Sequence, residues 1–481
     1  MAAQWGCLLA KRCKPTRILP AKRCKNSPIL VAKRCRALYD GFMDGLILKR
    51  KMEQKLVDWK NAARRDAILI NGARQIGKST IVKNFGKKYY KSFIEINFIE
   101  KPQYRKAFDG NLDAETIIFN LSAMKLGPFI KGETLIFFDE IQKCPNARTA
   151  IKFLVEDGSY DYIESGSLLG ISYNEGVDSY PVGFEERLEM YPMDFEEFLW
   201  AKGISDEVIN RLKECYRQVK PVPDFLHEQM MKLFREFIIV GGMPEAVVAH
   251  VTSPDFNETL RVQNKLVAGY REDIANYAGK DKLLTRNIFD AIPEQLAKEN
   301  KRFILASLEK GAATRKYEDA SMWLSEAGVG YHCFNVSALE LPLELSAKRN
   351  LYKLYIVDTG LLCALSMGGI QSQILQGQIE INEGGIAENI IACELAKKGI
   401  PLYYYDHKSR CELDFIFKEN GKISILEVKS GKNYKKHASL DNVIQSSDAS
   451  KFERKIVLCK ENIKFGEHGI IYYPLYMAMF L

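Results

Sequence analysis

The stretch "AILINGARQIGKST" (residues 67–80) decides the fold of this 481-residue chain. Its first four residues are apolar and predict a buried strand, whereas "TIVKNFGKKY" (80–89) has the apolar spacing of a helix. Between them, the pattern Gly72-x4-Gly77-Lys78-Ser79 supplies a flexible backbone, an ammonium group and a hydroxyl. Successive backbone N–H groups and a helix N-terminus together favour bound phosphate. The sequence therefore predicts a P-loop between a strand and a helix.

The loop chemistry predicts ATP and Mg²⁺ as cofactors. Lys78 is expected to reach the β- and γ-phosphates, and the Ser79 hydroxyl to hold Mg²⁺. The residues expected to bind the nucleotide are Gly72, Ala73, Arg74, Gln75, Ile76, Gly77, Lys78, Ser79, Thr80, Asp139 and Ser165.

A second apolar strand ends in two carboxylates. In "TLIFFDEIQKCP" (134–145), Asp139 is placed to coordinate Mg²⁺ through water and Glu140 to polarise the attacking water. Glu140 could alternatively be a solvated charge at a strand end. A third strand, "YDYIESGSLLG" (160–170), ends in hydroxyls, and Ser165 is either a γ-phosphate sensor or part of a simple turn.

The positive charge of the chain is concentrated at its start. Residues 1–51 hold 13 of the 69 basic residues and two of the 61 acidic ones, so this segment carries +11 and the rest −3. The first 45 residues repeat "AKRC" with a period of eleven and contain several prolines. We interpret them as a translated tandem repeat ahead of the true start; a nucleic-acid-binding tail and an organelle-targeting segment are the alternatives.

The composition indicates a globular protein of two to four domains. No run of about 18 apolar residues occurs, so we expect no membrane span. Eleven cysteines without a C-x-x-C pair favour a reducing, cytoplasmic setting and indicate neither a zinc site nor a disulfide framework.

Several segments resemble the prokaryotic AAA-type P-loop ATPases that carry an uncharacterised C-terminal domain. The segments are "NGARQIGKST", "TLIFFDEIQKCPNARTAIKFLVEDGSYDYIESGSLLG", "PVGFEERLEMYPMDFEEFLWA", "VGGMPEAVVAH" and "YREDIANYA". The resemblance covers residues 46–481 and implies ATP hydrolysis and, as such enzymes commonly form rings, a homo-oligomer. Two residues depart from the family: Glu164 replaces a small or apolar residue, and Phe184 replaces a Lys or Arg. Arg187 and Arg148 are the candidates for an arginine finger, in that order.

The middle of the chain is predicted to be helical, followed by a hairpin. Apolar spacing predicts a helical lid over 203–284. Residues 285–349 read as three helices followed by the alternating ribbon "VGYHCFNVSALELPLEL" (329–345), which is the pattern of a winged helix. Arg315 and Lys316 would begin its third helix and contact DNA, although winged helices also dock proteins.

The C-terminal segment, residues 350–481, combines carboxylates and a lysine. "CELDFIFKENGK" (411–422) carries Asp414, and "ISILEVKSG" (423–431) carries Glu427 and Lys429 on one face of a strand. With Glu388 on a preceding helix and the element order α-β-β-β-α-β, this segment resembles the PD-(D/E)xK nuclease superfamily. The resemblance implies catalytic roles for Asp414, Glu427 and Lys429 and a Mg²⁺ site at Asp414, Glu427 and Glu388.

A purely structural role for this segment is the alternative, because a buried Glu–Lys pair on a strand needs no catalytic role. The fold class we expect is α/β: a parallel-sheet P-loop ATPase core (46–202), the helical lid, the winged helix and the nuclease-like domain. One hypothesis couples ATP hydrolysis by Lys78 and Glu140 to DNA cleavage. The other is a nucleotide-dependent switch whose C-terminal domain only binds DNA or a protein. Convergence of the four C-terminal residues within metal-ligand reach in a concave, basic-walled pocket would favour cleavage. A Lys429 buried in an ion pair with Glu427, in a closed pocket, would favour the switch.

Overall fold

The computed structural model describes residues 47–63, 65–166, 181–253, 255–304, 314–375, 384–407, 411–431, 433–446 and 448–481. Residues Leu48–Leu481 form one compact unit, separate from Met1–Ile47. The expectations for the repetitive tail therefore lie outside the described residues. None of the described helices is both long and apolar enough to cross a membrane.

The first sheet is parallel throughout and has the strand order β2-β3-β4-β1-β5. Its strands are β1 (Ala67–Gly72), β2 (Ser92–Asn97), β3 (Thr134–Asp139), β4 (Asp161–Ser165) and β5 (Glu185–Met190). This arrangement confirms the predicted α/β class with a parallel P-loop core. All strands are parallel, so Asp139 and Ser165, at the carboxyl ends of β3 and β4, lie at the same end of the sheet as the loop that follows β1.

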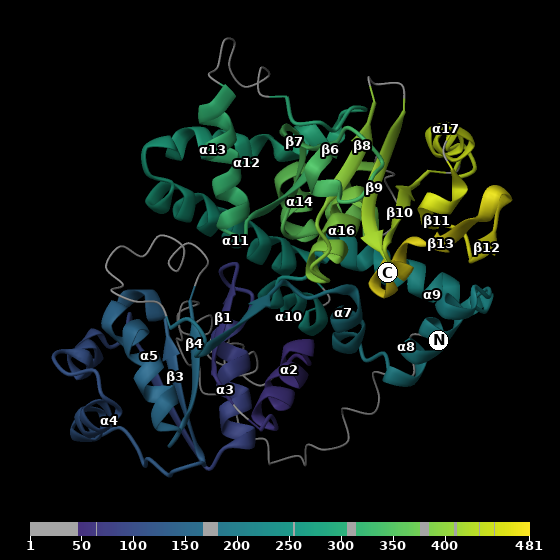
Figure 1. Cartoon of the computed structure of the whole chain (residues 1–481). Helices are drawn as coiled ribbons and strands as arrows, with labels where there is room; N and C mark the ends of the chain where they lie inside the picture. Colours follow the sequence, from purple (N-terminus) through teal and green to yellow (C-terminus); the bar gives the residue numbers. More distant parts are fainter. Residues whose placement is uncertain are drawn as a thin grey trace, which may run out of the picture. The chain divides into compact units, whose positions relative to one another are not determined.

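Helices cover both faces of this sheet (Figure 1). Along β3, Leu135 and Phe137 pack into one core cluster with residues of α3, whereas Ile136 and Phe138 pack into another with residues of α4 and α5. Alternate strand residues point to opposite faces, so a strand covered on both sides is apolar throughout. These helices, with α2 before β1, are α2 (Lys51–Lys60), α3 (Lys78–Tyr89), α4 (Ala114–Ala123) and α5 (Pro145–Asp157).

The next part of the chain is helical from residue 195 to residue 326, apart from short connections and the undescribed gaps. Its helices are α7 (Phe195–Ala201), α8 (Asp206–Gln218), α9 (Asp224–Val240), α10 (Pro244–Thr252), α11 (Phe256–Tyr277), α12 (Lys282–Ala297) and α13 (Thr314–Glu326). Pro244 is the first residue of α10. Most of the second helix predicted for the winged helix, residues 303–313, lies outside the described residues.

The second sheet has eight strands in the order β12-β13-β11-β10-β9-β8-β6-β7. They are β6 (Gly330–Val336), β7 (Ala347–Ile356), β8 (Tyr403–Asp406), β9 (Glu412–Glu419), β10 (Lys422–Val428), β11 (Phe452–Cys459), β12 (Lys464–Phe465) and β13 (Ile470–Pro474). The accompanying helices are α14 (Thr359–Ser366), α15 (Gln371–Leu375), α16 (Gly384–Lys397) and α17 (Ala438–Ser446). The element order from α16 to β11 is the predicted one.

The predicted wing is not a free hairpin. Strands β6 and β7 pair antiparallel, but β6 also pairs in parallel with β8 through Phe334 and Tyr403. The two strands are therefore the edge of the eight-stranded sheet, and the winged-helix prediction is not confirmed. The expected boundary between 349 and 350 falls inside β7. The chain becomes helical after Asp358, whose side chain accepts a hydrogen bond from Leu361 N–H.

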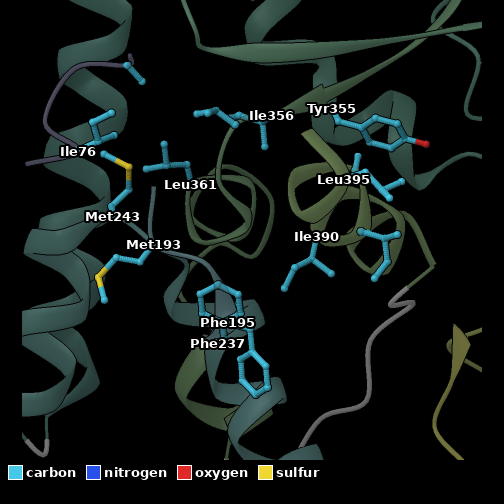
Figure 2. Close-up of a cluster of buried hydrophobic side chains, with 14 of the residues drawn as sticks. Ile76, Met193, Phe195, Phe237, Met243, Tyr355, Ile356, Leu361, Ile390 and Leu395 are labelled. Carbon is cyan, nitrogen blue, oxygen red and sulfur yellow. The ribbon is translucent and has the colours of Figure 1, made fainter. Parts of the chain in front are cut away.

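One hydrophobic cluster runs from the P-loop through the helical segment to the second sheet. Figure 2 shows part of it: Ile76, Met193, Phe195, Phe237, Met243, Tyr355, Ile356, Leu361, Ile390 and Leu395. Since cores are close-packed, a change at the loop is felt by neighbours in this cluster.

Candidate functional site

The P-loop geometry is built by two glycines. Gly72 ends β1 with φ 146°, and a Cβ there would lie 2.2 Å from the carbonyl oxygen of Met190. Gly77 precedes α3 with φ 93°, a left-handed conformation that favours glycine. The loop therefore turns directly from the strand into the helix, and the first turn of α3 carries Lys78, Ser79 and Thr80.

The Lys78 side chain folds back onto its own loop. Its Nζ donates to the carbonyl oxygens of Gly72 at 3.0 Å and Ala73 at 2.7 Å. Burial lowers the pKa of Lys78 to about 8, although the carboxylates of Glu140 and Asp139 act in the opposite direction. The hydrogen bonds of the ammonium group thus go to carbonyl oxygens of its own loop, while two carboxylates act on it from a greater distance.

The Asp139 carboxylate accepts hydrogen bonds from three side chains, which come from three different segments of the chain. Oδ1 accepts from Ser79 Oγ at 2.9 Å and also from Ser165 Oγ, and Oδ2 accepts from Asn97 Nδ2 at 2.9 Å. The structure therefore brings together the predicted Mg²⁺ residues and the predicted sensor. Asn97 was missed by the sequence reading, although a polar residue closing an apolar strand beside β3 was a usable signal.

Glu140 occupies a left-handed backbone conformation, with φ 57° and ψ 46°. Such a conformation is uncommon for a residue other than glycine. Its Oε2 accepts a hydrogen bond from Gln142 Nε2 at 2.5 Å. Glu140 lines a cleft of about 530 Å³ together with Lys78 and Ser79.

The opposite wall of the cleft comes from later segments of the chain. Pro244 and Glu245 of α10, Tyr270, Asp273 and Tyr277 of α11, and Ala327 and Val329 before β6 all line it. Asp273 forms an ion pair with Arg74, and the Tyr270 hydroxyl donates to the Arg74 carbonyl oxygen at 3.0 Å. The guanidinium and the main-chain carbonyl group of Arg74 are therefore both bonded to residues of α11.

Arg148 does not fit the role of an arginine finger. Its guanidinium is buried in ion pairs with Glu164 and Glu185, the first at 2.6 Å. This partner explains the unusual Glu164, whose pKa burial raises to about 8. The Arg187 side chain is 58% exposed and 3.2 Å from Glu185, so it keeps an accessible guanidinium.

The four residues of the predicted second site lie in one cluster on the second sheet. Asp414 on β9 accepts a hydrogen bond from Val428 N–H at 2.9 Å, and Lys429 pairs with Glu427 at 3.2 Å. Burial by itself lowers the pKa of Lys429, but the carboxylates of Glu427, Asp414 and Glu388 raise it. Glu388, on α16, therefore lies close enough to act on the Lys429 ammonium. Burial and the Asp414 carboxylate raise the pKa of Glu427 well above its usual value.

Lys353 of β7 lies among these carboxylates and was missed by the sequence reading. Its Nζ is 2.7 Å from Glu412, 3.4 Å from Glu388 and 3.8 Å from Asp414. The side chain is 0% exposed. Burial by itself lowers the pKa of Lys353, but the surrounding carboxylates raise it well above its usual value. A lysine in the apolar run "NLYKLYIVD" (350–358) was the available signal.

The described residues do not fit the predicted Mg²⁺ site at Asp414, Glu427 and Glu388. Both Glu388 oxygens are taken, Oε1 by Lys301 at 2.7 Å and Oε2 by Lys353 and Tyr355. Asp414 faces Lys353 and Val428 N–H, and Glu427 Oε2 faces Lys429. Among these oxygens, Glu427 Oε1 has no hydrogen-bond partner in the described part of the chain, and Asp414 Oδ1 lies 3.8 Å from Lys353 Nζ, beyond hydrogen-bond distance. No group of three or more His, Cys, Asp or Glu residues there is arranged to hold a metal ion.

Comparison with known proteins identifies the first domain. Residues 64–199 match the AAA domain family, so this part of the chain is an AAA-type ATPase domain. Residues 231–372 and 383–477 match two domains of unknown function, DUF8612 and DUF4143. No curated protein matches the chain.

Three solved structures illustrate the similarity. The Walker-type ATPase PABY2304 of Pyrococcus abyssi is 16% identical, with 66% of this chain and 96% of that chain covered and a TM-score of 0.40. The Aeropyrum pernix Orc1 protein in complex with DNA is 12% identical, covering 68% and 95%, with a TM-score of 0.26. AMPPCP-bound DnaA from Aquifex aeolicus is 13% identical, covering 58% and 86%, with a TM-score of 0.26. Scores this low do not establish a shared overall fold.

Proposed function

We propose that this protein is a Mg²⁺-dependent, ATP-hydrolysing nucleotide switch. The observation that carries the proposal is the convergence of Ser79 and Ser165 on the Asp139 carboxylate, beside Glu140 in the cleft. A hydroxyl from the P-loop and a carboxylate at a strand end are the protein groups that hold Mg²⁺ beside phosphates in P-loop enzymes.

Each residue then has a distinct task. The loop backbone from Gly72 to Ser79 binds the phosphates, and Lys78 leaves its carbonyl partners to pair with them. Ser79 and Asp139 hold Mg²⁺, which neutralises the charge developing on the transferred phosphoryl group. Glu140 polarises the attacking water, and Ser165 links the γ-phosphate position to Asp139.

Coupling to the rest of the chain passes through the opposite wall of the cleft. Phosphate binding competes with Asp273 for the Arg74 guanidinium, so nucleotide occupancy acts directly on α11. Helix α11 packs against α10, α12 and α14, and α12 and α14 contact β7 of the second sheet. Ala327 and Val329 provide a second route, because they line the cleft immediately before β6.

The C-terminal sheet serves in this proposal as a binding module without cleavage. The ion pair between Glu427 and the partly exposed Lys429, together with the buried Lys353 beside the neighbouring carboxylates, supports the switch over the nuclease that the sequence resemblance implied. DNA is the partner we test first, because that resemblance places the module among nucleic-acid-binding folds.

ATP turnover of the full chain tests the proposal, with and without duplex DNA, beside Glu140→Gln. We expect the variant to lose about 10²-fold or more of the turnover while it still binds ATP, because only the group that polarises water is removed. Glu115→Gln, at an exposed position on α4, is the matched control. Turnover that is absent in the wild type, or unchanged in Glu140→Gln, would contradict the proposal. Turnover that does not change with DNA would point instead to a protein as the partner.

A further inference from the structure

The carboxylate cluster of the second sheet already contains a cation that belongs to the chain. Three carboxylates, from Glu388, Glu412 and Asp414, lie within 4 Å of the Lys353 ammonium. Glu388 comes from helix α16, and Glu412 and Asp414 come from strand β9. Lys353 comes from the edge strand β7, which precedes both elements in the sequence.

We propose that the Lys353 ammonium takes the place of a divalent metal ion in this cluster, so that the second sheet holds a tethered cation and does not load Mg²⁺ or Mn²⁺. Divalent ions such as Mg²⁺ bind through oxygen ligands, and proteins hold Mg²⁺ through one or two carboxylates while several waters complete its coordination shell. Here the oxygens of Glu388 and Asp414 are directed at Lys353, at Lys301 or at a backbone N–H group. Glu427 Oε1 has no hydrogen-bond partner among the described residues, and Asp414 Oδ1 lies 3.8 Å from the Lys353 ammonium, so a divalent ion bound at Asp414 Oδ1 would meet that positive charge.

The position of Lys353 favours a permanent occupant over a mobile one. Its side chain is fully buried, and its Nζ lies 5.1 Å from the centre of the Tyr404 ring on β8. Its strand is held by pairing with β6, where Lys353 lies opposite Cys333. The ammonium cannot leave the carboxylates without leaving them buried and uncompensated, which is costly. A diffusing cation would have to displace it against this cost.

Mn²⁺ binding to the nucleotide-free full chain tests the proposal, with bound and free Mn²⁺ measured by electron paramagnetic resonance. We expect the wild type and Asp414→Asn to bind the same number of Mn²⁺ ions, so any ion bound at the nucleotide cleft cancels in the comparison. Asparagine is isosteric and can still accept from Val428 N–H, so this variant should fold. Loss of one bound ion in Asp414→Asn would overturn the proposal.

A gain of metal binding provides the converse test. Lys353→Met removes the cation and should create a Mn²⁺ site about tenfold or more tighter than any the wild type has at this cluster. If excess negative charge prevents folding, Lys353→Met combined with Glu412→Gln restores the balance and keeps Glu388, Asp414 and Glu427. A Lys353 variant that folds and gains no site would overturn the proposal.

Lys301→Met is the matched control for position. Lys301 also pairs with Glu388, at 2.7 Å, but its side chain is 17% exposed and lies at the rim of the cluster. We expect this variant to gain no Mn²⁺ site, although it loses the same charge. An equal gain in Lys301→Met would show that net charge, not the position of Lys353, excludes the metal.

Discussion

Arg74 of the P-loop and Asp273 of α11 form an ion pair although 199 positions separate them in the sequence. The Asp273 side chain is almost fully buried and the Arg74 side chain is 58% exposed. The buried partner is therefore fixed, whereas the exposed guanidinium can turn toward a nucleotide. This asymmetry makes the pair suitable for reporting occupancy of the cleft to α11.

Asp273→Asn should tighten ATP binding and weaken the response of the second sheet. Removing the carboxylate leaves Arg74 free for phosphate, which should strengthen ATP binding by about 0.5–1 kcal/mol at this half-exposed site. Calorimetric titration measures the affinity, and hydrogen exchange at β6 measures the response to ATP. Glu272→Gln, at an exposed neighbouring position, is the control. Unchanged affinity together with an intact β6 response would contradict the coupling route.

ATP binding should weaken as the pH rises above 8. Burial lowers the pKa of Lys78 to about 8, so the free protein loses the positive charge there, far below the usual value of 10.5. Each pH unit above this point should reduce affinity by up to about tenfold, because binding must restore the proton. Lys78→Arg keeps its charge and should bind with an affinity independent of pH between 7.5 and about 9.5. Parallel pH profiles would count against the assignment.

Arg148 and Arg187 should differ sharply in their contribution to stability. Arg148→Met leaves Glu164 and Glu185 buried without their cation and should lower the free energy of unfolding by about 3–5 kcal/mol. Arg187→Ala removes an exposed group and should change it by less than about 0.5 kcal/mol. Denaturant unfolding of the two variants measures both values. Equal effects would mean that the buried triad is not a unit.

Glu427→Gln should remove a pH dependence of stability. Burial and Asp414 raise the folded-state pKa of Glu427 well above 4.5, so the folded protein retains a proton that the unfolded chain releases. Wild-type stability should therefore fall as the pH rises from about 4.5 toward the folded pKa, by up to about 1.4 kcal/mol per unit. The variant has no proton to lose and should become the more stable protein as the pH rises.

Denaturant unfolding at a series of pH values from acid to neutral measures this difference. Glu461→Gln, at an exposed position near the end of β11, is the control and should follow the wild type. A constant difference between Glu427→Gln and the wild type across the series would show that Glu427 is ionised in the folded protein.

The first domain was largely predictable because its chemistry is local. Gly72, Lys78 and Ser79 lie in one short segment of the sequence, and Asp139 and Glu140 directly follow the apolar run "TLIFF". The parallel sheet then follows from the strand–helix alternation. The roles of these residues in catalysis remain predictions.

The second sheet was less predictable because its decisive contacts are distant in the sequence. Lys353 meets Glu388 across 35 positions, and no spacing rule connects a strand lysine to a helix carboxylate that far away. The winged-helix prediction was not confirmed, for a related reason. A hairpin has the same alternation whether it stands free or, like β6 and β7, pairs with a later strand.

The eight-stranded sheet also has a consequence for how such chains are inherited. The segment matched by the first domain of unknown function contributes β6, β7 and Lys353. The segment matched by the second contributes β8 to β13 and all four carboxylates of the cluster, from Glu388, Glu412, Asp414 and Glu427. Recombination between the two segments would give one partner an unpaired strand edge and a buried excess of negative charge. Natural selection should therefore pass these two segments on together, as one evolutionary unit.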